Sequence, residues 1–132
     1  MTPLQNLHYA IGLIAYAIAN VDGKIQKEER TKFHNIVAAE MRCKDYDFDI
    51  SEIIFKVMDK DKIDSATAYE WAMNEIRLDS HYLSSKLKAT FMKVIDKVAE
   101  AYPPVTKEEA EIIRKFRFDI FTIRGDKVFT HE

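Results

Sequence analysis

The carboxylates around an Asp-Gly turn are the side chains of this sequence best suited to chemistry. Asp22 and Gly23 follow an apolar stretch, and Glu28 and Glu29 come a few residues later. Glycine supplies the positive φ with which a chain leaves a helix sharply, and acidic residues are favoured in the first turn of the next helix. Carboxylate oxygens are also the ligands that hard divalent cations prefer. The stretch therefore predicts either an ordinary turn before an acidic helix or a cation site built on that turn.

An EF-hand calcium loop is the first template to test for such a site. With Gly23 at the sixth position, Asp22 falls at the fifth and Glu29 at the twelfth, where that loop places oxygen ligands. The first position is then Ile18, whose apolar side chain cannot replace the ligand with which these loops begin. We therefore reject a standard EF-hand for this turn.

The residues around the turn resemble the signature of TerB-like tellurite-resistance proteins. An alanine-rich apolar stretch leads into Val-Asp-Gly-Lys-Ile at positions 21–25, and a Glu-Glu pair follows. The resemblance is carried by Ala17, Ala19, Val21, Asp22, Gly23, Ile25, Glu28 and Glu29. It implies an all-helical fold with a duplicated motif, a role in stress resistance, and a link to metal-linked assemblies near the membrane.

A second copy of the motif lies 80 residues further along, because positions 98–109 align with positions 18–29. The aligned pairs are Ile18 with Val98, Ala19 with Ala99, Ile25 with Val105, Glu28 with Glu108, Glu29 with Glu109, Phe33 with Ile113, and upstream Ile11 with Phe91 and Ile14 with Val94. The copies differ at the turn, where positions 102–104 read Tyr-Pro-Pro and carry no carboxylate. Thr106 and Glu109 have capping-box spacing, which gives Glu109 a structural role. We therefore expect two helix-turn-helix halves, with Glu108 joining the carboxylates of the first turn when the halves pack.

The apolar spacing predicts one all-α domain over residues 1–132. Apolar residues recur at intervals of three and four, the spacing of one buried helix face, in about six segments. These segments are expected at about 3–21, 26–41, 50–58, 65–78, 82–102 and from 106 onward. The first is apolar almost all round between Tyr9 and Val21, so we expect it to be a central core helix.

Two acidic segments are expected to connect helices. Positions 45–49 alternate acidic with aromatic residues, and Asp49 has capping-box spacing to Glu52, so a helix is expected to begin after Asp49. Positions 59–64 space three carboxylates as a calcium loop begins, but the sixth position is Asp64 and no glycine follows to make the sharp turn. A mixed-charge linker is the preferred interpretation of this second segment.

Composition narrows the class of function. Acidic and basic residues nearly balance, at 22 against 20, and a net charge of −2 gives no electrostatic case for nucleic acid. The apolar run to Val21 is shorter than the roughly 20 residues that a membrane span needs, and no basic leader precedes it, so neither membrane insertion nor a secretory signal is expected. Cys43 stands alone, which favours a reducing compartment and a cytoplasmic location.

Three classes of function are compatible with these patterns. The first is a non-enzymatic stress-response module that binds a divalent cation of unknown identity. Its expected ligands are Asp22, Glu28, Glu29 and Glu108. The second is a metal-free interaction domain whose acidic helix starts dock a basic protein partner. The third is a metal-dependent hydrolase, which we do not expect, because the chain has neither His residues at ligand spacing nor an evident pair of catalytic acid and base.

Overall fold

The computed structural model describes residues 2–21, 35, 45–100 and 106–123, and apart from short connections this part of the chain is helical. The α-helices are α1 (Pro3–Ala19), α3 (Asp45–Asp61), α4 (Ser65–Leu78), α5 (Ser85–Glu100) and α6 (Lys107–Thr122), with a 3-10 turn η1 (Ser80–Tyr82) before α5. The predicted all-α class is therefore confirmed for the described residues, which contain five α-helices. Of the helix expected at 26–41, the structure describes residue 35 alone, and the rest of that prediction lies outside the described residues.

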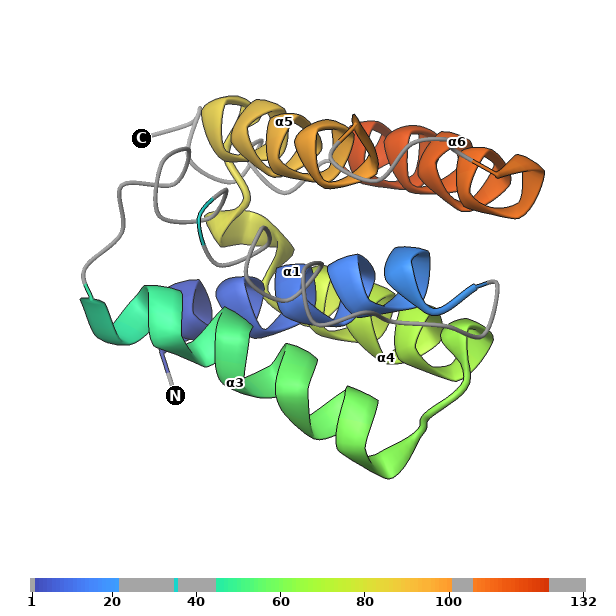
Figure 1. The fold of residues 1–132 in the computed structure, drawn as a ribbon. Helices are drawn as coiled ribbons and strands as arrows, with labels where there is room; N and C mark the ends of the chain where they lie inside the picture. The colour runs from blue at the N-terminus through green and yellow to red at the C-terminus, as the bar shows by residue number, and fades with distance from the viewer. Residues whose placement is uncertain (1, 22–34, 36–44, 101–105, 124–132) are drawn as a thin grey trace.

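Helix α1 is the centre of the molecule. It contacts α3 and α4 on one side and α5 and α6 on the other (Figure 1). From Leu7 to Ala19 every residue except Tyr9 is buried, which confirms the core helix predicted from its all-round apolar sequence. A capping box starts the helix: the Gln5 N–H donates to Thr2 Oγ1 at 3.1 Å, and the Thr2 N–H donates to Gln5 Oε1 at 2.9 Å.

Helices α5 and α6 run antiparallel in the layer above α1 (Figure 1). Four residues of α5 that align with α1 at the offset of 80 are buried as their counterparts are. Phe91, Val94, Val98 and Ala99 are 0–6 % exposed, as are Ile11, Ile14, Ile18 and Ala19. The agreement is limited to these pairs, because α1 is buried almost all round, whereas α5 has an exposed face that carries Lys93 and Lys97. No helix in the described part of the chain is both long and apolar enough to cross a membrane.

Helix α3 is longer than the sequence predicted. It begins at Asp45 and ends at Asp61, so the expected connection at 45–49 with an Asp49 cap is wrong, and the expected linker at 59–64 is shorter than predicted. Acidic residues at the start of a helix are favoured by the unpaired N–H groups and the macrodipole. The acidic residues at positions 45–49, which were expected in a connection, thus belong to the first five residues of the helix.

Helix α4 has the predicted bounds, whereas α5 starts later than expected. Its expected start near residue 82 is wrong, because η1 comes first and Ser84 then caps α5. The Leu87 N–H donates to Ser84 Oγ at 3.1 Å, and a serine side chain that accepts from the third residue of a helix is a favourable N-cap. Leu83 is fully buried between the two elements and anchors the connection.

Candidate functional site

The end of α1 is the point from which the expected acidic turn continues. Asn20 caps the helix, and its N–H donates to the Tyr16 carbonyl at 2.9 Å. The Tyr16 hydroxyl and Asn20 Nδ2 both donate to the carbonyl oxygen of Ile63, the latter at 3.3 Å. These two hydrogen bonds hold the last turn of α1 against the connection between α3 and α4.

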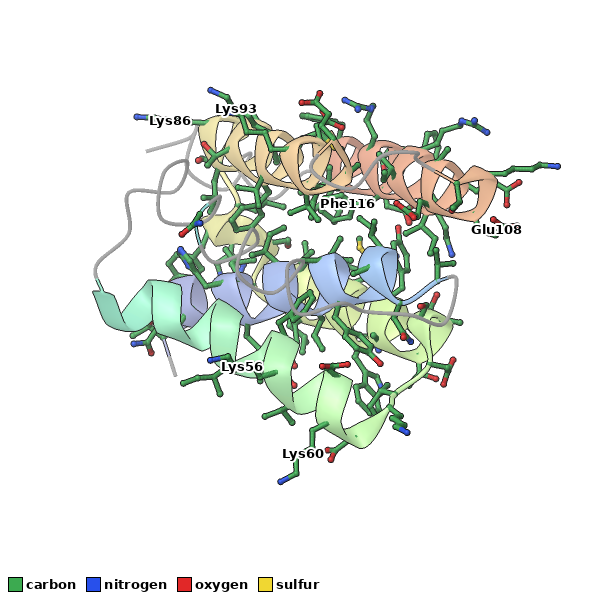
Figure 2. All side chains as sticks on the ribbon, viewed as in Figure 1. Lys56, Lys60, Lys86, Lys93, Glu108 and Phe116 are labelled. Atoms are coloured by element: carbon green, nitrogen blue, oxygen red, sulfur yellow. The ribbon has the colours of Figure 1, made fainter. Side chains whose placement is uncertain are left out.

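Among the four expected cation ligands, Glu108 lies within the described residues. It is exposed in the first turn of α6. In Figure 2 it lies at the end of the molecule where α1 also ends, and α1 and α6 contact each other. The other three expected ligands, Asp22, Glu28 and Glu29, lie outside the described residues.

The connection between α3 and α4 is a Schellman turn. The Ile63 N–H donates to the Met58 carbonyl at 3.2 Å, and the Lys62 N–H donates to the Asp59 carbonyl at 3.3 Å. Lys62 has a φ of 53°, in the left-handed region that this turn requires. Asp64 then caps α4 by accepting from the Thr67 N–H at 3.1 Å and from the Thr67 hydroxyl at 2.7 Å. The Asp64 carboxylate is therefore used for capping.

Two carboxylates of this connection, those of Asp59 and Asp64, lie close enough to Tyr16 of α1 to affect its phenol. Hydrogen bonds from the Thr67 side chain and backbone hold the pKa of Asp64 below its ordinary value, so the carboxylate stays charged. Burial raises the pKa of the Tyr16 phenol, and the charges of Asp59 and Asp64 raise it further. Tyr16 therefore remains a neutral hydrogen-bond donor to Ile63 beside two negative charges.

Helix α6 begins with the cap that the sequence predicted. The Glu109 N–H donates to Thr106 Oγ1 at 3.1 Å, and the Glu109 side chain is buried. The Glu108 side chain, in the same first turn, is exposed to solvent (Figure 2). Across residues 2–21, 45–100 and 106–123, no three His, Cys, Asp or Glu side chains gather closely enough to hold a metal ion.

A polar cluster that sequence reasoning missed joins α4 to α6. The Tyr69 hydroxyl donates to Asp119 Oδ2 at 2.5 Å. Lys115 Nζ lies 4.6 Å from the centre of the Tyr69 ring and 3.8 Å from Glu70 Oε1. Burial raises the pKa of Tyr69, and the hydrogen bond and charge of Asp119 raise it further, so the phenol does not act as a base at neutral pH. The partners are about fifty residues apart, and no local spacing in the sequence reveals them.

An open groove of about 420 Å³ lies between α5 and α6. Its lining includes Met92, Lys93, Asp96, Lys97, Arg117 and Phe121. Arg117 Nη2 contacts both carboxylate oxygens of Asp96, at 2.9 and 3.2 Å, across the two helices. Phe121 is 50 % exposed at the edge of the groove. An apolar floor with a charged rim is suited to binding another protein.

Comparison with known proteins finds no match: no protein-family model, no curated protein and no solved structure matches the chain.

Proposed function

We propose that this chain is a non-enzymatic, TerB-like stress-response module that binds a divalent cation at the end of α1. The proposed ligands are Asp22, Glu28, Glu29 and Glu108. The observation that carries the proposal is the position of Glu108, which lies at the end of the molecule where α1 also ends. Asp22 follows this end of α1 in the sequence. We further propose that the module works in the cytoplasm, with a protein partner in a membrane-associated stress complex.

Two features of the described residues support this proposal. Four aligned pairs of α1 and α5 are buried alike at the offset of 80, as a duplicated motif requires. The hydrogen bonds to Ile63 give the turn after α1 a fixed starting point, and a cation site needs ligands held in place by their surroundings. Carboxylates alone would favour a hard cation such as Ca²⁺ or Mg²⁺.

The test is thermal unfolding of chelator-stripped protein with Ca²⁺, Mg²⁺, Mn²⁺ or Zn²⁺ added singly. A cation that binds only the folded state stabilises it by mass action, by about 2.7 kcal/mol when its concentration is a hundred times Kd. The Tm therefore rises. A variant with Asp22→Asn, Glu28→Gln and Glu29→Gln should lose this rise, and Glu108→Gln alone should reduce it. The control variant Glu70→Gln, Glu75→Gln and Glu100→Gln removes three carboxylates of α4 and α5, none of them a proposed ligand, and should keep the rise. If no cation raises the Tm of the parent, the metal site is rejected.

The second candidate function is docking of a basic protein partner without a metal. The observation that favours it is the exposure of Glu108 and Glu111, which lie one turn apart at the start of α6. Such a partner should bind more weakly in high salt. Glu108→Gln with Glu111→Gln should weaken this binding even in the presence of a chelator. If the carboxylates act through a bound cation, their replacement has an effect only when the cation is present.

A further inference from the structure

The outer face of α5 carries four charged residues in an unusual order. Lys93, Asp96, Lys97 and Glu100 are separated by three, one and three residues, so they share one face of the helix. Lys93, Lys97 and Glu100 are exposed, and the Asp96 side chain is 38 % exposed. Together with Arg117 and Phe121 of α6 they form the rim of the groove between the two helices.

This order places opposite charges at the three-residue spacing, Lys93 with Asp96 and Lys97 with Glu100, but not at the four-residue spacing. At the four-residue spacing that best supports such pairs, Lys93 lies against Lys97 and Asp96 against Glu100, and like charges at this spacing destabilise a helix. Both lysines also have an interaction within the chain, and Asp96 is held by Arg117. Three of the charged side chains of this face are thus held by contacts within the chain, but charged residues of this face that lie four positions apart carry charges of the same sign.

The same four charges match a second copy of themselves. If two α5 helices pack antiparallel about a twofold axis that passes between positions 96 and 97, Lys93 meets Glu100 of the second copy. Asp96 then meets Lys97 of the second copy, and the symmetry repeats each pair. A twofold interface must be self-complementary in this way, because the same patch forms both sides. All four cross-pairs join opposite charges.

Apolar area lies beside these charges on α6. Phe121 is 50 % exposed and lines the groove, and Phe118, one turn earlier, is 69 % exposed. Exposed aromatic residues next to a charged rim are typical of surfaces that bind another protein. We propose that a second copy of this chain docks on this α5–α6 face, antiparallel along α5 and centred between Asp96 and Lys97.

The test is the mass of the full chain in solution, measured by sedimentation over a range of protein concentrations. The parent should form a dimer that weakens as salt is raised, because salt screens the rim charges. Lys93→Glu with Lys97→Glu makes the four α5 positions all acidic, and Asp96→Lys with Glu100→Lys makes them all basic. Each variant alone should sediment with the mass of one chain. Mixed together, the two variants should recover the mass of two, because every cross-pair is again opposite in charge.

A matched control is available on α3. Lys56 and Lys60 are exposed at the same spacing as Lys93 and Lys97, across the molecule from α5 (Figure 2). Lys56→Glu with Lys60→Glu changes the net charge equally and should leave the dimer intact. Circular dichroism should show that every variant remains helical. A monomeric parent at all concentrations, a dimer in either charge-reversed variant, or a mixture that stays monomeric would each overturn the proposal.

Discussion

Lys62 shows how a single residue sets the boundary between two helices. Its left-handed conformation closes the Schellman turn and lets Ile63 return to contact α1. Glycine is the usual residue at this position, since a Cβ in the left-handed region costs roughly 1 kcal/mol. The turn could therefore not be predicted from the sequence, because positions 59–64 contain no glycine.

Replacing Lys62 with glycine should stabilise the protein. Lys62→Gly removes the Cβ strain, and we expect the free energy of unfolding to rise by about 0.5–1 kcal/mol in urea titrations. Lys56→Gly, six residues earlier in the body of α3, should instead lower it by about 0.5–1 kcal/mol, because glycine is unfavourable within a helix. Equal losses in both variants would mean that residue 62 does not need a positive φ.

The Tyr69 hydroxyl is a second residue with a measurable contribution. Tyr69→Phe removes its hydrogen bond to Asp119 and should cost about 1–2 kcal/mol of unfolding free energy near neutral pH. The folded phenol has a raised pKa, so it stays protonated above pH 10.0, the ordinary value at which the unfolded phenol ionises. The stability it contributes is therefore complete below that pH and is lost as the pH rises beyond it.

Parent and Tyr69→Phe should accordingly become more alike in stability at alkaline pH. Urea unfolding of both proteins at neutral pH and above pH 10.0 measures the difference. Tyr82→Phe is the control, because Tyr82 is 48 % exposed and its loss should change stability by less than about 0.5 kcal/mol. A difference between parent and Tyr69→Phe that does not shrink with pH would contradict the assigned role of the phenol.

At the scale of elements, apolar spacing predicted the bodies of the helices better than their ends. α1 and α4 follow their predicted ranges closely, because their inward stripes leave one solution for burial. α3 was predicted too short, since Asp residues are frequent both in turns and in helical first turns, and spacing does not separate these uses. Only tertiary contacts decide such ends.

Only those features of the candidate site that depend on local sequence patterns could be predicted. The cap at Thr106, the exposure of Glu108 and the inward phase of the second copy follow from local patterns. The hydrogen bonds that hold the end of α1 were not predictable, because Ile63 is 43 residues from Asn20 and its carbonyl is an atom that every residue has. Long-range partners of this kind come from packing.

At the scale of the whole molecule, α1 connects the two layers. It contacts α3 and α4 on one side and α5 and α6 on the other, and its side chains between Leu7 and Ala19 supply much of the buried core. A helix buried on all sides has no face that solvent can stabilise. The folding of the α3–α4 layer and that of the α5–α6 layer should therefore depend on each other through α1.

Ile14→Ala tests this dependence. Ile14 is fully buried in the middle of α1, and its truncation should cost about 2–5 kcal/mol by leaving a cavity. Because both layers rest on α1, unfolding followed by Trp71 fluorescence on α4 and by far-UV circular dichroism should give coincident transitions in parent and variant. Ile53→Ala, at a side chain 55 % exposed on α3, should change stability by less than about 0.5 kcal/mol. A Trp71 transition that precedes the loss of helicity in Ile14→Ala would show that α4 unfolds independently of the α5–α6 layer, and that α1 does not couple them.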